Sequence, residues 1–208
     1  MSKLERYNGA LGRLSERKLA SLTEAREPRR VLDDFWDSVT AYCLARGYWK
    51  HAKRSLRIEA SANITPAFGP RFAFEKPDDL VRVYLISGTE SMEPGFSYLD
   101  ENGVWYADAD TIYVTYVSND PAFGMDLSRW GAMFSEYVEA RLALKAGPRI
   151  TNNKADLDVL IAEEKRAMNV ALGVDAMEGP PAVPPLNSWV RARGGGGNRA
   201  RWDGGWSG

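Results

Sequence analysis

The residues TIYVTYVS at positions 111–118 are the clearest β-strand in this sequence. β-Branched or aromatic side chains occupy both sets of alternating positions: Ile112, Val114 and Tyr116 on one, and Tyr113, Thr115 and Val117 on the other. Because side chains alternate between the two faces of a strand, both faces carry apolar groups. We therefore expect both faces of this strand to be covered by other parts of the protein.

The chain on the N-terminal side of this strand has the same composition. Short runs rich in Val, Ile, Tyr and Phe are separated by Gly, Pro, Asp and Asn, namely SLRIEAS (55–61), RFAFEK (71–76), LVRVYLIS (80–87) and VWYADAD (104–110). Asn102-Gly103 is the dipeptide that tight hairpins favour, because both central residues of that turn need positive φ. The pattern predicts a small antiparallel sheet over residues 55–118, with a hairpin at 101–103.

Helical periodicity precedes the sheet. Apolar residues with spacings of three and four, from Leu4 to Leu14, predict a helix over 3–14. Pro28 suits the first turn of a second helix, and an apolar stripe that includes Trp36 and Cys43 predicts that this helix runs over 28–50.

Two more helices are predicted after the sheet. The first runs over 126–146, with Asp126 as N-cap and Gly147-Pro148 as its end. The second runs over 153–173, is capped by Asn152 or Asn153 and ends at Gly173. Its expected buried stripe is Leu157, Leu160, Ile161, Met168, Ala171 and Leu172. The predicted class is α+β, with about four helices, two before and two after the sheet.

The last thirty residues, 179–208, differ from the predicted body, 1–178. They are rich in proline, glycine, arginine and tryptophan and contain no run that could bury one face. We expect an extended arm, with a polyproline-like first half and a glycine-rich half that is flexible until bound. At about 3.3 Å per residue such an arm could reach roughly 100 Å.

Composition excludes several classes of protein. The 208 residues are 44% hydrophobic and 26% charged, which is typical of globular proteins. No apolar stretch approaches the roughly 20 residues that cross a bilayer, and the opening residues lack the apolar core of a signal peptide. With one cysteine, Cys43, and one histidine, His51, a single chain forms neither a disulfide nor a Cys/His zinc site. We expect no metal and no cofactor.

Charge is segregated along the chain. Residues 1–60 carry a net charge of +5, residues 61–151 carry −6, residues 152–178 carry −3 and residues 179–208 carry +3. Basic ends and an acidic middle would suit head-to-tail contacts between copies, because unlike faces can meet. An ordinary mixed surface is the alternative interpretation.

Few residues favour catalysis. His51 follows the end of a predicted helix, where a surface or capping role is expected, and Cys43 lies on an apolar stripe. Three acidic pairs could serve as general acid and base in a cell-wall glycosidase: Asp78/Asp79, Asp100/Glu101 and Asp108/Asp110. Carboxylates at strand ends and turns are usually solvated, so we expect no enzymatic activity.

The arm also has more than one interpretation. RARGGGGNRAR (191–201), with tryptophans on both sides, contains the ingredients of nucleic-acid-binding tails. Its charge is low for that role, and tryptophans more often anchor a chain in pockets of another protein. A tail without a role remains the third alternative.

Several segments resemble the tail tubular protein A or head-to-tail adaptor family of tailed bacteriophages. The most specific are LGRLSERKLASLTEAREPRR (11–30), FAFEKPDD (72–79) and YADADTIYVTYVSNDP (106–121), and PPLNSWVRAR (184–193) also contributes. The resemblance covers nearly the whole chain. It implies a helical bundle bearing a small β-sheet, which agrees with the order of elements predicted above.

The resemblance further implies a structural role in the virion. Adaptors of this family form a ring, typically of twelve copies, between the portal and the tail tube or nozzle, and DNA passes through the ring without sequence-specific binding. It implies no catalytic motif, no membrane and a location in the virion neck, with the host cytoplasm before assembly. The arm would bind the portal through Trp189, Arg191, Arg193, Arg199, Arg201, Trp202 and Trp206.

A ring that DNA crosses should repel phosphates. We therefore expect some acidic residues of the last two helices to line the channel: Glu136, Glu139, Asp156, Asp158, Glu163 and Glu164. Three rival functions stay open at this point: a nucleic-acid-binding protein that uses the basic tail, a wall-degrading enzyme, and another neck component such as a stopper or tail terminator.

Overall fold

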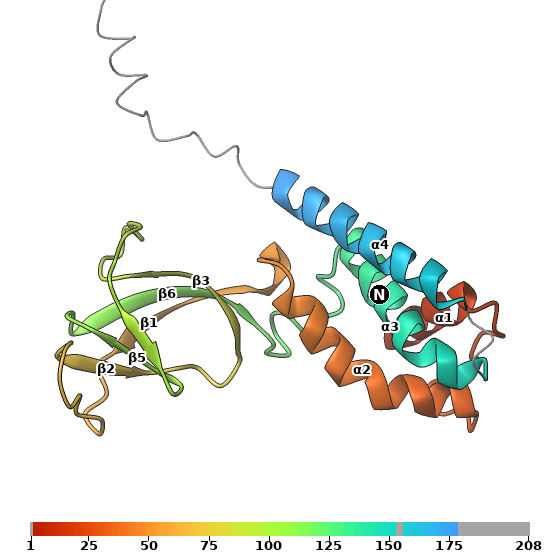
Figure 1. The fold of residues 1–208 in the computed structure, drawn as a ribbon, viewed down its shortest axis with the longest axis horizontal. Coiled ribbons are helices and arrows are strands. Elements are labelled where there is room, and N and C mark those ends of the chain that lie inside the picture. The colour runs from red at the N-terminus through yellow and green to blue at the C-terminus, as the bar shows by residue number, and fades with distance from the viewer. Residues whose placement is uncertain (1, 153–155, 179–208) are drawn as a thin grey trace, which may run out of the picture. The chain divides into compact units, whose positions relative to one another are not determined.

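In the sequence, two α-helices precede the strands and two follow them (Figure 1). The structure is a computed structural model that describes residues 2–152 and 156–178. The elements are α1 (Lys3–Arg13), α2 (Glu27–Ala45), the 3-10 helix η1 (Lys50–Ala52), β1 (Lys53–Glu59), β2 (Phe72–Glu75), β3 (Leu80–Ser87), β4 (Leu99–Glu101), β5 (Val104–Ala107), β6 (Thr111–Ser118), α3 (Ala132–Ile150) and α4 (Leu157–Met177). The α+β prediction is confirmed. The predicted arm, 179–208, lies outside the described residues.

The strands form two small antiparallel sheets where one was predicted. One has the order β1-β6-β3 and the other β2-β5-β4. Asn102 and Gly103 have φ angles of 46° and 82° and connect β4 to β5, which confirms the predicted hairpin.

β6 contributes to two hydrophobic cores. Its face with Ile112, Val114 and Tyr116 is buried in the sheet core, together with Phe74 and Trp105. On the opposite face Val117 is buried among the helices, whereas Tyr113 and Thr115 are only partly buried. The second face is therefore covered only at the end of the strand that meets the helices.

A carboxylate fastens the strands of the first sheet. Asp79, in the β2–β3 turn, accepts hydrogen bonds from the Arg54 guanidinium (2.9 Å), the Tyr116 hydroxyl (2.9 Å) and the Ser118 hydroxyl. Burial acts to raise the pKa of Asp79, but these hydrogen bonds and the Arg54 charge outweigh it and lower the pKa. The acid therefore stays ionised and joins β1, β6 and the turn.

The helical core lies between α1, α2 and α3. Its fully buried members come from all three helices and include Tyr7, Leu11, Leu32, Cys43, Tyr137, Leu142 and Ala146. Cys43 lies on the apolar face of α2, as predicted, and burial raises its pKa to about 12. The thiol therefore remains protonated at neutral pH.

The first two predicted helices differ from the structure mainly at one end. α1 closely matches the predicted 3–14, but α2 ends at Ala45 and does not reach residue 50. The indole N–H of Trp49 donates to the Cys43 carbonyl oxygen (2.8 Å), which turns the chain out of the helix and into η1. A side-chain hydrogen bond from a residue beyond the helix, which helical periodicity does not reveal, therefore accompanies the end of α2.

α3 begins and ends later than predicted. Asp126 accepts hydrogen bonds from the backbone N–H and the hydroxyl of Ser128, so it closes a turn and α3 starts only at Ala132. The helix then continues through Gly147-Pro148 to Ile150. A proline costs about 3 kcal/mol inside a helix, and the burial of neighbouring residues such as Leu142 and Ala146 offsets this cost in the last turn.

α4 is also displaced from the predicted range of 153–173. Asp156 caps it by accepting from the N–H groups of Asp158 (3.1 Å) and Val159 (3.3 Å), a role predicted for Asn152 or Asn153, the latter outside the described residues. Gly173 lies within α4, which continues to Met177. The added turn includes Asp175, whose carboxylate accepts from the Lys50 N–H (2.9 Å).

His51 is partly buried and packs against α3, so its predicted surface or capping role is wrong. Its ring contacts Phe134, with centroids 4.6 Å apart, and its Nε2 atom is buried without a hydrogen-bond partner. Burial lowers the pKa of His51 to about 4, although the charge of Asp175 acts in the opposite direction. The folded protein therefore favours the neutral imidazole.

This burial predicts a pH dependence of stability. Because the folded-state pKa lies below the ordinary value of 6.5, protonation favours unfolding as the pH falls from about 6.5 to about 4. We expect the free energy of unfolding of His51→Gln, measured with urea at several pH values, to decline less over this range than that of the wild type. Equal slopes would contradict the prediction.

Other titrating groups do not obscure this comparison. The pKa values of Asp33 and Asp79 are lowered from 3.8, so their effect is lost only at more acidic pH. Burial raises the pKa of Glu139, which has the opposite effect on the slope but is present in both proteins. The difference between wild type and variant therefore isolates His51.

Gly9 allows α1 and α3 to approach closely around an ion pair. A Cβ at Gly9 would overlap the carboxylate of Glu139, whose Oε1 atom lies 2.7 Å from the Arg6 guanidinium. At Gly12, on the same helix, a Cβ would meet no atom within 4 Å. The two glycines therefore differ in what surrounds them.

We expect Gly9→Ala to lower the free energy of unfolding by about 1–3 kcal/mol, because the added methyl displaces the paired carboxylate. Gly12→Ala is the matched control and should be neutral or stabilising by up to about 1 kcal/mol, the usual gain on replacing a helical glycine. Urea denaturation of both variants tests this. Equal stability of the two variants would refute the role assigned to Gly9.

Candidate assembly surfaces

The six acidic residues predicted to line a channel fall into two groups. Four are exposed or partly exposed on α3 and α4 or at the start of α4: Glu136, Asp156, Asp158 and Glu163. Glu139 and Glu164 instead lie inside the helical body and pair with arginines. The exposed four therefore remain candidates for a surface that faces DNA.

The two buried carboxylates hold the helices together. Glu139 on α3 pairs with Arg6 of α1 at 2.7 Å, and Glu164 on α4 pairs with Arg141 of α3 at 3.5 Å. Burial raises the pKa of Glu139, and Arg6 partly counteracts this. The Arg141 guanidinium also lies 3.9 Å from the centre of the Tyr42 ring. Both acids thus form ion pairs between helices of one subunit and do not face solvent as a channel lining would.

A comparison of Glu164 with its neighbour tests this assignment. Glu163 is more exposed and pairs with Arg13 at 3.4 Å. We expect Glu164→Ala to cost about 3 kcal/mol or more, because it leaves Arg141 buried without its counter-charge. Glu163→Ala should cost no more than about 1 kcal/mol, the usual value for an exposed pair. Urea denaturation measures both, and a similar cost for the two would contradict the assignment.

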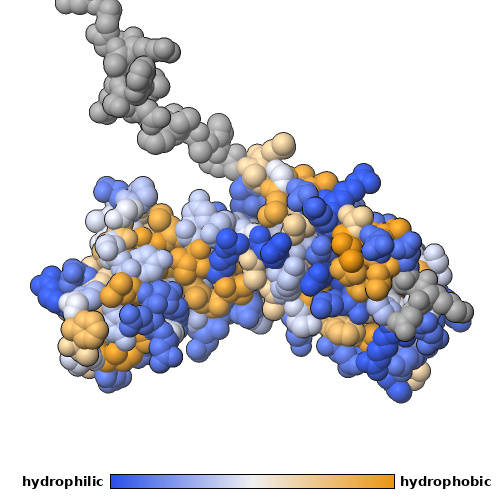
Figure 2. All heavy atoms as spheres, in the orientation of Figure 1, coloured by the Kyte–Doolittle hydropathy of each residue, from blue (hydrophilic) through white to orange (hydrophobic). Residues whose placement is uncertain are grey.

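Four exposed apolar side chains lie along one side of α4, next to its buried stripe. Val159, Val170, Val174 and Met177 are 51%, 43%, 38% and 84% exposed. Because 11, 4 and 3 residues separate them, they lie along one side of a helix with 3.6 residues per turn. We call these four residues the α4 outer face. Figure 2 shows apolar surface in the region of α4.

The buried side of α4 is apolar apart from one carboxylate. Leu160, Glu164 and Ala171 are buried, and Met168 and Leu172 pack against the helical core. Leu157 and Ile161, also predicted for the buried stripe, are instead about half exposed, so that prediction is right only in part. Exposed apolar side chains along one side of a helix, such as the α4 outer face, are typical of a surface that another protein covers.

A second surface lies where α2 leads into the first sheet. The rings of Tyr48 and Tyr84 meet edge to face, with centroids 5.3 Å apart. The Lys53 ammonium lies 3.7 Å from the Tyr84 ring centre, and the Arg82 guanidinium lies 4.2 Å from that of Tyr48. We call these four residues the tyrosine corner. It combines exposed aromatic area with positive charge.

The acidic pairs that could have suggested a glycosidase have structural partners. Asp79 holds the first sheet, Asp100 accepts from Lys76 (2.6 Å) and from the Trp105 indole (3.1 Å), and Asp108 pairs with Arg71 (3.4 Å). One member of each pair therefore has a role in the fold.

A hollow of 510 Å³ opens where the ends of α1 and α3 meet the start of α4. Two of its carboxylates already have partners, since Glu163 binds Arg13 and Asp156 caps α4. Within residues 2–152 and 156–178, no group of three or more His, Cys, Asp or Glu side chains could hold a metal ion. Across the same residues, no helix combines the length and apolar character needed to cross a membrane.

The portal-binding residues predicted on the arm, from Trp189 to Trp206, lie outside the described residues. The α4 outer face and the tyrosine corner were not predicted from the sequence. The basic run RGYWKHAKR (46–54) is the signal that could have indicated the corner. The chain matches no protein-family model, and no curated protein matches it.

Proposed function

We propose that this protein is a structural head-to-tail adaptor of a tailed bacteriophage. Copies of the chain, typically twelve in the family it resembles, would form a ring between the portal and the tail tube or nozzle. DNA would cross the central channel without sequence-specific binding. In this proposal the protein performs no reaction and resides in the virion neck.

The α4 outer face is the observation that carries the proposal. Four apolar side chains on one side of a surface helix are costly in water, at about 25 cal/mol for each Å² of exposed apolar area. Coverage by a neighbouring subunit in a ring removes that cost. A monomeric enzyme or a freely diffusing nucleic-acid-binding protein provides no such coverage.

The exposed acids fit the same arrangement. Glu136, Asp156 and Asp158 extend from α3 and from the start of α4 without an ion pair among the described residues. Facing the channel, they would repel phosphates and keep DNA from adhering to the wall. The segment 179–208 would extend to the portal, where its tryptophans and arginines would anchor each copy.

Substitutions on the outer face test the assembly. We expect Val170→Asp combined with Val174→Asp to leave the monomer folded but to abolish the ring, because charge replaces apolar area at the subunit contact. Asn169→Asp, exposed on the same helix away from the outer face, is the matched control and should assemble normally. Native mass spectrometry measures the oligomer, and circular dichroism confirms folding.

Electron cryo-microscopy of particles tests the location. The proposal requires a ring of this chain directly beneath the portal. A chain found at another level of the neck would identify a stopper or tail terminator instead. Turnover of peptidoglycan by the purified protein would support the enzymatic alternative and refute the structural role.

A further inference from the structure

The outer face of the β2-β5-β4 sheet carries negative charge around an apolar centre. Glu75 of β2 and Glu101 of β4 both pair with Val104 of β5 across the sheet, so the three side chains lie in one row on one face. The next row on that face contains Tyr106 and Leu99. We call these five residues the acidic sheet face.

The two carboxylates of this face lack basic partners. Among the described residues neither Glu75 nor Glu101 forms an ion pair, and the carboxylate of Glu75 accepts a hydrogen bond from the Ser61 hydroxyl (3.0 Å). Both carboxylates are exposed, and Leu99, the first residue of β4, is 48% exposed. The face therefore presents apolar side chains flanked by two free negative charges.

The tyrosine corner has the opposite charge and the same layout. Tyr48 and Tyr84 form an aromatic centre, 40% and 50% exposed, with a cation on each side. Lys53 has no carboxylate partner in the described part of the chain, and Arg82 donates only to the Ala45 carbonyl oxygen (3.2 Å). The edge-to-face rings hold both cations at the surface.

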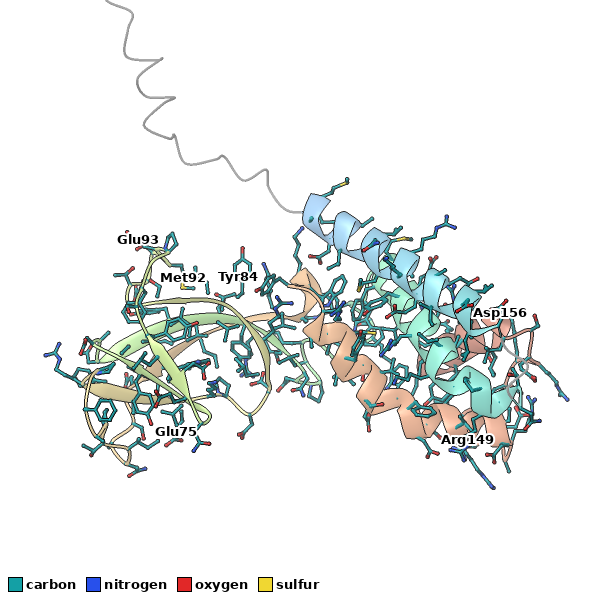
Figure 3. All side chains as sticks on the ribbon, viewed as in Figure 1. Glu75, Tyr84, Met92, Glu93, Arg149 and Asp156 are labelled. Atoms are coloured by element: carbon teal, nitrogen blue, oxygen red, sulfur yellow. The ribbon has the colours of Figure 1, made fainter. Side chains whose placement is uncertain are left out.

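One subunit does not bring these two surfaces together. Figure 3 shows Tyr84 and Glu75 on opposite sides of the strands. An acidic face and a basic face on opposite sides of one body fit a contact in which each copy offers a different surface to the next. Such heterologous contacts generate a closed ring when the rotation between copies closes.

We propose that the tyrosine corner of one copy binds the acidic sheet face of a second copy of this chain. The proposal rests on the adaptor function above and identifies one of the contacts between neighbours in the ring. The two tyrosines and the apolar row of Val104 and Leu99 supply the buried area. The four charges orient the contact and discourage wrong pairings.

Charge reversal on each surface tests this contact. Lys53→Glu with Arg82→Glu reverses the corner, and Glu75→Lys with Glu101→Lys reverses the sheet face. Each reversal alone sets like charges against each other, so we expect it to weaken self-association at least about tenfold. A chain that carries all four substitutions restores opposite charges and should associate within about threefold of the wild type.

An equimolar mixture of the two reversed variants provides an independent test of the contact. Each corner then meets an opposite charge on the other variant, so the mixture should assemble although neither component does. Arg71→Glu with Asp108→Lys, which exchanges the members of an ion pair located just before β2 and just after β5, is the matched control and should associate like the wild type. Sedimentation velocity and native mass spectrometry measure association, and circular dichroism checks folding.

The outcomes separate this contact from the adaptor proposal. If either reversal associates like the wild type, or the fourfold variant does not recover, the contact is refuted while a ring beneath the portal still supports the adaptor. A wild-type chain that stays monomeric also refutes it. If the corner reversal abolishes binding to a DNA duplex but not self-association, the corner is a nucleic-acid site and the proposal is wrong. Should the corner reversal unfold the chain, Lys53→Gln with Arg82→Gln replaces it.

Discussion

The buried indole of Trp49 is the contact on which the connection between helices and strands depends. Its N–H donates to the Cys43 carbonyl oxygen and ends α2, while its ring contacts Phe134 of α3 with centroids 4.7 Å apart. The next residues form η1 and lead directly into β1. One side chain thus ends a helix, joins the helical core and sets where the first strand begins. Few other residues satisfy a hydrogen bond and fill a core of this size at once.

Charge holds the helical body together in places where apolar packing would be expected. Arg6–Glu139 joins α1 to α3, and Arg141–Glu164 joins α3 to α4. α4 packs on this body through apolar residues such as Leu160 and Ala171 and also carries the exposed α4 outer face. These exposed apolar side chains support the proposed oligomer more strongly than any motif in the sequence.

Much of the fold could be predicted from periodicity and turn chemistry. The alternation in TIYVTYVS, the Asn102-Gly103 turn and the apolar stripe of α2 are local signals, and the structure confirms each of them. Helix ends were predicted less well. Asp126 closes a local turn with Ser128, a role that its residue type shares with helix capping, so the sequence does not separate the two. Pro148 is tolerated inside α3, and Asp175 extends α4 by contacting Lys50, a partner 125 residues away that no local pattern reveals.

The candidate surfaces likewise divide into features that the sequence predicts and features that depend on the folded structure. The sequence by itself determined the order of elements, the hairpin, the separation of basic ends from an acidic middle and the scarcity of catalytic groups, since all of these depend on neighbours along the chain. Only the tertiary structure decided that Glu164 is buried and Glu139 largely so, while Val170 and Val174 are exposed. It also decided that the cations of the tyrosine corner lack acidic partners among the described residues. The reason is that burial and charge pairing depend on which distant residue faces a side chain, and helical spacing indicates a face without specifying what packs against it.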